Sequence, residues 1–269
     1  MNPFPIDAYA YANRWRWVHP AEKIIFAALT IALCLASGAP LVCLLGLGMA
    51  TLAVTRGAGI PLRAYWHFLR LPFGFIIAGV LTMAVVAVPG GGPDTLVAWP
   101  VGPWHIGVTS ASLAQAARVL AVSVASVGCT LFLALTTPMV DISDQLRRWH
   151  VPALFVELML LVYRFIFVLL ETAQAMHLAQ ESRMGYSTWG RSLRSVAMLA
   201  SNLYLRSHAR ASALFTALSA RGYTGELRVL QPRPEWSARH LWLIAAAEGL
   251  LLVVALAVHL GGVHLGGLP

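Results

Sequence analysis

The sequence predicts an all-α integral membrane protein with about five transmembrane helices and a cytoplasmic domain of long helices. Apolar residues make up 58% of the chain and charged residues only 11%, whereas a soluble domain carries roughly 25% charged residues. The mean hydropathy is +0.71. The apolar residues form long runs and do not alternate with period two, so the spans are helices and not the strands of a barrel.

Five apolar runs supply the predicted spans. A helix needs about 20 mainly apolar residues to cross a bilayer, so the two shortest runs need their flanking residues to complete a span. The first run has basic residues before it, as a secretory signal peptide does. The long segment that precedes it contains Asp7 and Glu22, which favours a retained helix. The runs cover 24–36, 41–54, 72–88, 108–135 and 241–260.

Basic residues are distributed unevenly among the connections. Three precede the first run, and the connection 56–70 contains three arginines and no acid, whereas Asp94 is the only charged residue in 89–107. The positive-inside rule then places the N-terminus and 56–70 in the cytoplasm and 89–107 outside. Five spans leave the C-terminus outside. We therefore expect three regions: N-terminal transmembrane helices 1–4 over 1–136, a cytoplasmic helical domain over 137–240, and a C-terminal transmembrane helix and tail over 241–269.

The stretch 137–240 contains twelve arginines and seven acids. Most of the formal net charge of +8 arises here, because 182–240 alone holds nine arginines and two acids. Because the composition predicts a membrane protein, this excess of arginine indicates that the stretch lies in the cytoplasm, and it does not indicate nucleic-acid binding. We expect two long helices over about 152–184 and 189–220, ended by Gly185 and Gly222.

The apolar segment 156–170 is a candidate for a sixth span. Glu157, Arg164 and Glu171 recur every seven residues and form a polar stripe on one face of this otherwise apolar helix. Arginines lie on both sides of the segment, so a single crossing would place one group outside. We therefore expect a long amphipathic helix at the inner membrane face.

The sequence lacks the motifs of several kinds of enzyme and metal-binding site. Lys23 is the only lysine, and no Gly-rich loop followed by Lys-Ser/Thr is present, so we expect no ATP hydrolysis on this chain. Asp141 and Asp144 resemble half of a Mg²⁺-diphosphate site, but both suit the first turns of a helix and no second acidic cluster exists. The nine histidines are scattered, and we predict no metal site, catalytic residue or cofactor. Gln115 and Arg118 are costly in lipid, so we expect them to face the bundle interior.

The two long helices end in similar segments. Residues 179–186 read Ala-Gln-Glu-Ser-Arg-Met-Gly-Tyr, and residues 218–225 read Leu-Ser-Ala-Arg-Gly-Tyr-Thr-Gly. A cation near the last carbonyls and a glycine that ends the helix explain either segment alone. Two such ends on adjacent basic helices indicate a pair of tips that bind a partner, because arginine forms bidentate ion pairs with carboxylates.

These segments carry a resemblance. Together with Thr137-Pro138, Val151-Pro152 and Tyr163-Arg164-Phe165, they resemble the transmembrane T component of energy-coupling factor (ECF) transporters of the cobalt-transport CbiQ type, most closely over about 135–227. In that family, two Ala-Arg-Gly motifs end coupling helices and bind two cytoplasmic ATPase subunits. The second copy matches directly, whereas the first has Ser for Ala and Met for Gly, with glycine one place later. The docking residues implied by the resemblance are Ser182, Arg183, Met184, Gly185, Ala220, Arg221 and Gly222.

The resemblance also implies partners and a mechanism. The T component is a non-catalytic scaffold in the bacterial inner membrane that joins two P-loop ATPase subunits to a separate metal-capture (S) subunit, with a small accessory membrane subunit as a further candidate partner. It passes ATP-driven movement to the capture subunit, which takes up cobalt or nickel. Two other classes stay open: a conventional ABC permease with its own substrate pathway, and an intramembrane lipid or prenyl transferase.

Overall fold

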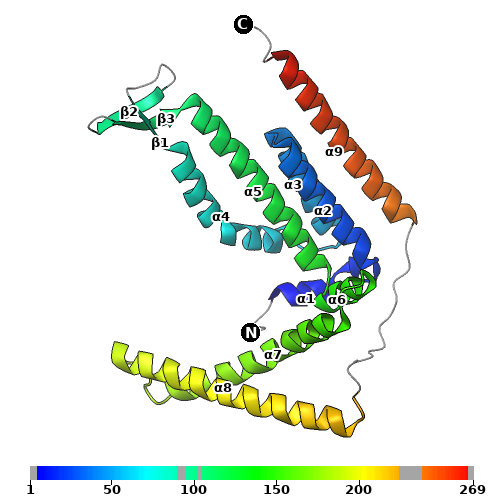
Figure 1. The fold of residues 1–269 in the computed structure, drawn as a ribbon, viewed down its shortest axis with the longest axis vertical. Helices are drawn as coiled ribbons and strands as arrows, with labels where there is room; N and C mark the ends of the chain where they lie inside the picture. Colours follow the sequence, from blue (N-terminus) through cyan, green and yellow to red (C-terminus); the bar gives the residue numbers. More distant parts are fainter. Residues whose placement is uncertain (1–4, 90–94, 102–103, 224–237, 266–269) are drawn as a thin grey trace. The chain divides into compact units, whose positions relative to one another are not determined.

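The computed structural model describes residues 5–89, 95–101, 104–223 and 238–265 (Figure 1). The chain divides into two compact units, one formed by Met1–Pro138 with Arg233–Pro269 and the other by Met139–Pro232. Helices form most of both units, in agreement with the predicted all-α class.

The helices of the first unit begin and end at residues that favour those positions. Proline occupies the first turn of both α2 and α3. Backbone N–H groups in the first turn have no partner within the helix, so the N–H that proline lacks costs no hydrogen bond there. Gly38 ends α2 with φ 56°, and Thr109 caps α5 through a reciprocal pair of bonds with Ser112. The elements are α1 (Pro5–Ala12), the 3-10 turn η1 (Arg14–Trp17), α2 (Pro20–Ser37), α3 (Pro40–Leu52), the π turn η2 (Ala53–Gly57), α4 (Leu62–Ala84), α5 (Ser110–Thr136) and α9 (Ala238–Leu265).

Within the described residues, six helices are long and apolar enough to cross a membrane. Five correspond to the predicted runs: α2, α3 with η2, α4, α5 and the His240–Leu260 part of α9. The expected end of the third run at residue 88 is wrong, because α4 ends at Ala84 and residues 86–88 belong to a β-strand. The sixth is α7 (Ala153–Glu181), which includes the 156–170 segment that we expected at the membrane face. Its length and mean hydropathy of 2.4 suit a membrane span, whereas the charged residues Glu157, Arg164 and Glu171 favour the membrane face, so the position of α7 stays a prediction.

The expected start of the third span is wrong. We expected a helix from residue 72, after a basic connection, but α4 begins at Leu62 and therefore includes Arg63 and Arg70. Pro72 lies inside the helix, where it removes one backbone hydrogen bond without ending the helix. Figure 1 shows α4 changing direction along its length, as an internal proline explains.

The connection after α4 contains a small sheet that the sequence analysis did not predict. Strands β1 (Val86–Pro89), β2 (Thr95–Val101) and β3 (Trp104–Thr109) form an antiparallel sheet in the order β1-β3-β2. The register pairs Val86 with Gly107 and Val101 with Trp104. The prolines and glycines of this region indicated an irregular loop, but the valines and aromatic residues between them favour strands.

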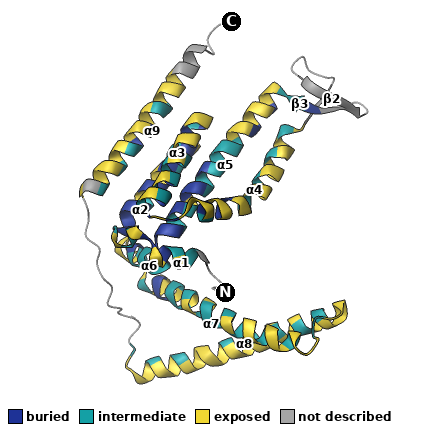
Figure 2. Cartoon of the chain, turned by 180° about the vertical axis from the view of Figure 1, so that it is seen from behind, coloured by how far each residue is buried: buried dark blue, intermediate teal, exposed yellow. Residues whose placement is uncertain are grey.

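The core of the first unit forms around α5, which packs against α2, α3 and α4. Figure 2 shows buried residues where these helices meet and exposed residues on the outer faces of α4 and α9. Gly128 of α5 is buried, and the Tyr65 hydroxyl of α4 donates a hydrogen bond of 3.1 Å to its carbonyl. Large apolar side chains such as Phe75 and Leu81 are exposed on α4, as expected for a helix that faces lipid.

The only lysine has a structural role. Lys23 is buried near the N-terminus of α2, and its ammonium donates a hydrogen bond of 2.9 Å to the carbonyl of Thr136. Thr136 is the last residue of α5, where carbonyls lack helical partners and a cation is favourable. Lys23 therefore ties the start of one helix to the end of another.

The expectation that Gln115 and Arg118 face the bundle interior is wrong, because both residues are exposed on α5. The Arg118 side chain instead lies against Gly38, where an added Cβ would meet its Cδ and Nε at 3.2 Å. This position lies at the C-terminal end of α2, whose carbonyls favour a nearby cation. A long side chain can thus leave the apolar region without entering the core.

The second unit contains α6 (Met139–Arg148), α7 and α8 (Trp189–Ala220), and the bounds of α8 are those predicted. His150, with φ 63°, lies in the break between α6 and α7. Glu157, near the start of α7, accepts a hydrogen bond from Tyr223, which lies three residues after the end of α8. Gln180, near the end of α7, bonds to the backbone near the start of α8. The two long helices therefore form an antiparallel hairpin.

Candidate functional site

The first predicted tip follows the end of α7. Ser182 is the C-terminal cap, and Arg183 and Met184 are exposed. Met184 has the left-handed conformation, with φ 59°, which is uncommon for a residue other than glycine. The amide of the next residue, Gly185, donates a hydrogen bond of 2.8 Å to the carbonyl of Gln180. This bond spans five residues and closes the helix end in a Schellman-type turn.

The second tip, at the end of α8, has the same backbone arrangement. Arg221 is the C-terminal cap, and Gly222 has the left-handed conformation with φ 73°. The amide of Tyr223 then donates a hydrogen bond of 3.0 Å to the carbonyl of Leu218, again five residues back. Arg183 and Arg221 therefore occupy equivalent positions, each one residue before the left-handed residue.

The structure corrects the expected role of Gly185. We expected this glycine to end the helix, but Met184 adopts the left-handed conformation that ends it. Gly185 is needed for a different reason, because an added Cβ would lie 2.8 Å from both the Gln180 carbonyl oxygen and Ser195 Oγ. The first tip thus lacks room for a side chain at the position after its left-handed residue, whereas the second tip has Tyr223 there.

Side-chain bonds hold the first tip against α8. The Tyr186 hydroxyl donates to Gln180 Oε1 at 2.7 Å, and Gln180 Nε2 donates to the Ser195 carbonyl at 3.0 Å. Ser195 Oγ in turn donates to the Gly185 carbonyl at 2.9 Å. The ring of His177 stacks on Tyr186 with 4.6 Å between centroids. These contacts link residues of both helices, so the turn is fixed from both sides.

A side-chain hydrogen bond anchors the second tip to α7. The Tyr223 hydroxyl donates to Glu157 Oε2 at 2.8 Å. The hydrogen bond to the carboxylate stabilises the neutral phenol and raises the pKa of Tyr223 above its ordinary value. The sequence analysis noted both tyrosines as part of the near-repeat, but it did not anticipate their partners. Gln180 belongs to the first turn itself, whereas Glu157 lies 66 residues from Tyr223, too far along the chain for a local pattern to reveal it.

The two arginines are exposed and lie far apart. Among the residues that the structure describes, neither guanidinium makes a hydrogen bond or an ion pair. The 32-residue α8 separates the two tips, which corresponds to about 48 Å at 1.5 Å per residue. The structure therefore places Ser182, Arg183, Met184 and Gly185 together at one end of the hairpin and Ala220, Arg221 and Gly222 at the other.

Comparison with known proteins places the chain in a family. The sequence profile of the family described as "CbiQ: Cobalt transport protein" matches residues 12–232. The chain belongs to the CbiQ family. A cobalt transport protein CbiQ of Rhodobacter capsulatus is 38% identical over 257 residues, which cover 94% of this chain and 98% of the relative. The cobalt transport protein CbiQ of Salmonella typhimurium is 31% identical over 229 residues, or 83% of this chain and 99% of the relative.

A further relative has a different organisation. A putative fused cobalt transport protein CbiMQ of Methanocorpusculum labreanum is 33% identical over 220 residues, which cover 82% of this chain but only 36% of the relative. The matches and the apolar helices agree on a membrane transport component. This CbiQ-family chain is thus a multi-pass protein of the cell membrane.

The two aspartates considered as half of a Mg²⁺-diphosphate site have structural roles in this CbiQ-family chain. Asp144 pairs with Arg148 one helical turn later at 3.1 Å, and Asp141 lies in the first turn of α6 as expected for a favourable helix-dipole position. No group of three or more His, Cys, Asp or Glu side chains suited to a metal ion occurs among the described residues.

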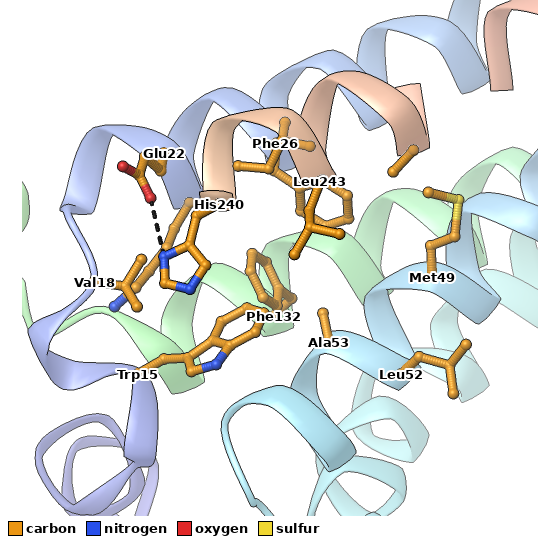
Figure 3. A pocket seen from close by; sticks show the side chains of 13 residues that line it. Trp15, Val18, Glu22, Phe26, Met49, Leu52, Ala53, Phe132, His240 and Leu243 are labelled. Carbon is orange, nitrogen blue, oxygen red and sulfur yellow. Dashed lines mark ion pairs between the residues drawn. The ribbon is translucent and has the colours of Figure 1, made fainter. Parts of the chain in front are cut away.

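An apolar cavity of about 410 Å³ lies in the first unit between η1, α2, α3, α5 and α9 (Figure 3). Glu22 and His240 lie at one side of it, with 3.6 Å between Glu22 Oε2 and His240 Nδ1, and Trp15 lies beside His240. This pair joins the first turns of α2 and α9, so its position indicates a role in holding α9. The remaining lining residues include Phe26, Met49, Leu52, Ala53, Phe132 and Leu243.

The paired tips allow a matched test of helix-end conformation. A side chain in the left-handed region costs about 1 kcal/mol, and nothing lies within 4 Å of an added Cβ at Gly222. We expect Gly222→Ala to weaken the second tip by this amount, while Met184→Gly tightens the first. Hydrogen exchange measured by mass spectrometry should then show roughly fivefold faster exchange of the Tyr223 amide in the first variant. The Gly185 amide should exchange more slowly in Met184→Gly than in the unmodified chain. Slower exchange of Tyr223 in Gly222→Ala together with faster exchange of Gly185 in Met184→Gly would contradict the prediction.

Proposed function

We propose that this chain is the scaffold and coupling (T) subunit of an ECF-type importer, whose two tips each dock one cytoplasmic P-loop ATPase subunit. The observation that carries the proposal is the equivalence of Arg183 and Arg221. Both are exposed, both precede a left-handed residue, and both follow the end of a long helix. An exposed guanidinium on a hydrogen-bonded turn is positioned for a bidentate ion pair with a carboxylate of another chain.

The separation of the tips supports two docking events. At about 48 Å apart along α8, the arginines are too far apart to contact one small site. Two similar tips at opposite ends of one hairpin suit two copies of the same kind of subunit. A movement of one copy relative to the other would then act on both ends of the α7–α8 hairpin, which is the coupling role that we propose.

We assign the cargo as cobalt, with nickel as the alternative, and place its capture on another membrane subunit. The names of the CbiQ relatives support a cobalt system. The fused relative supports a separate capture chain, because its name joins a second part to CbiQ and this chain matches only 36% of it. We further propose that the N-terminus and residues 137–240 lie in the cytoplasm, which the excess of arginine in that stretch favours.

Capture of partners tests the proposal directly. The full chain with a C-terminal tag is purified in mild detergent from its own host, and the proteins that co-purify are identified. We expect a soluble P-loop ATPase at two copies for each chain and a small membrane subunit. Reconstitution of the whole set should then support ATP-dependent cobalt uptake into vesicles. Cobalt uptake by the purified chain alone would favour a conventional permease instead.

A further inference from the structure

A crevice between α7 and α8 combines two cations with an apolar lining. It has a volume of about 290 Å³, and the two cations are Arg164 of α7 and Arg210 of α8. Five apolar side chains complete it: Leu161, Phe165, Val168, Ala213 and Leu214. The crevice lies within the second unit and is distinct from both arginine tips, which lie at the ends of these helices.

The two arginines have no acidic partner among the described residues. Neither makes a hydrogen bond or an ion pair there. Glu157 and Glu171 lie seven residues on either side of Arg164, about 10 Å away along the helix, and Glu157 accepts the Tyr223 hydroxyl. Helix α8 carries four arginines and no acid between Trp189 and Ala220. The crevice therefore presents positive charge that an anion can neutralise.

The surroundings of the crevice indicate a lipid rather than a soluble anion. One face of α7 exposes large apolar side chains at intervals of one, three or four residues, so that they form a continuous stripe on the helix. Such a stripe beside a polar face is typical of a helix that lies in a membrane interface. The stripe consists of Leu154, Phe155, Leu158, Val162 and Ile166.

We propose that this crevice binds one anionic phospholipid, with its phosphate between Arg164 and Arg210 and the first part of an acyl chain along the apolar lining. Basic pockets beside membrane helices recognise anionic headgroups in this way. The volume suits a headgroup and a chain segment rather than a whole lipid, so the remaining chain would extend along the exposed stripe of α7. A soluble phosphate gains nothing from the five apolar side chains. The proposal depends on the membrane location of the chain and not on ATPase docking.

Native mass spectrometry of the delipidated full chain in detergent tests this site. The protein is mixed with equal amounts of dioleoylphosphatidylglycerol and dioleoylphosphatidylcholine, and the retained lipids are counted. We expect about tenfold preference for the anionic lipid, which the double variant Arg164→Gln/Arg210→Gln loses. The matched control Arg191→Gln/Arg194→Gln removes the same charge from exposed positions of α8 outside the crevice, and it should keep the preference.

A second variant tests the apolar half of the crevice. Ala213→Phe fills the space while both arginines remain, so it should also lower retention of the anionic lipid. Glycerol 3-phosphate at equal concentration should not displace the lipid, because it lacks an acyl chain. Circular dichroism and gel filtration check that each variant is folded.

Four results would overturn the proposal. Equal retention of both lipids by the unmodified chain would show that no anionic site exists. Equal loss in the control variant would show diffuse attraction to positive charge, and displacement by glycerol 3-phosphate would show a soluble phosphate site. Loss of a co-purifying protein from Arg164→Gln/Arg210→Gln, with unchanged lipid preference, would assign the crevice to a protein partner.

Discussion

Reversing the charge at both tips, with Arg183→Glu and Arg221→Glu together, is expected to abolish retention of the ATPase subunits while the chain still inserts in the membrane. Both guanidiniums are exposed and make no bond among the described residues, so their replacement leaves the folded hairpin intact. A buried charge pair at the centre of an interface contributes about 2–4 kcal/mol. A glutamate at the same position adds repulsion against the carboxylate of the partner.

The single variants give a sharper result than the double variant. Because about 48 Å of α8 separates the tips, the two substitutions should act independently. Arg183→Glu should leave one ATPase subunit bound at the second tip, and Arg221→Glu should leave one at the first. The measurement is the ratio of ATPase to tagged chain after affinity purification. We expect that ratio to fall from two to one in each single variant and to zero in the double variant.

A matched control separates docking from general charge effects. Arg206 is also an exposed arginine of α8, but it lies far from either tip. Arg206→Glu changes the net charge by the same amount and should leave the ratio at two. Conservative replacement by lysine at either tip should weaken retention less than glutamate does, because lysine keeps the charge but loses the bidentate geometry. An unchanged ratio in the double glutamate variant would exclude the tips as docking sites.

The second large effect is expected at Gly128, where α5 contacts both α3 and α4. A Cβ added there would clash with Leu47 of α3 and would lie 2.9 Å from the Tyr65 hydroxyl of α4. That hydroxyl also donates to the Gly128 carbonyl, so a larger residue disturbs packing and a hydrogen bond together. We expect Gly128→Leu to destabilise the first unit by about 3 kcal/mol, at the upper end of overpacking effects.

Thermal unfolding in detergent, followed by gel filtration of the heated sample, measures this effect. The control is Gly48→Leu in α3, a helical glycine with nothing within 4 Å of an added Cβ. We expect Gly128→Leu to lose its monodisperse peak at a lower temperature, while Gly48→Leu matches the unmodified chain. Equal behaviour of the two variants would show that α3, α4 and α5 do not pack as described.

Local signals predicted the elements that depend on local interactions. The bounds of α8 at Trp189 and Ala220, and the left-handed glycine after it, follow from composition and from the preference for glycine at helix ends. The starts of α2 and α3 are also determined locally, by proline in the first turn, although we expected the first run only from residue 24. In each case, the residues that determine the boundary lie within one helical turn of it.

The errors occurred where distant residues decide the outcome. Pro72 suggested a helix start, but the chain continues as a helix on both sides of it. The exposed position of Arg118 depends on the nearby end of α2, eighty residues earlier in the chain. The strands β1 to β3 pair segments whose composition also suits loops, so only their mutual hydrogen bonds reveal a sheet.

The sequence alone determined that this is an all-α membrane protein with a basic stretch whose two long helices each end near an arginine. These properties follow from apolar content, charge distribution and helix-end residues, all of which act over short distances along the chain. Only the tertiary structure decided that Met184 and Gly222 share one conformation, and that the two arginines lie at opposite ends of a hairpin. The physical reason is that bonds between separate helices, Gln180 with Ser195 and Glu157 with Tyr223, set the path of the backbone at each tip.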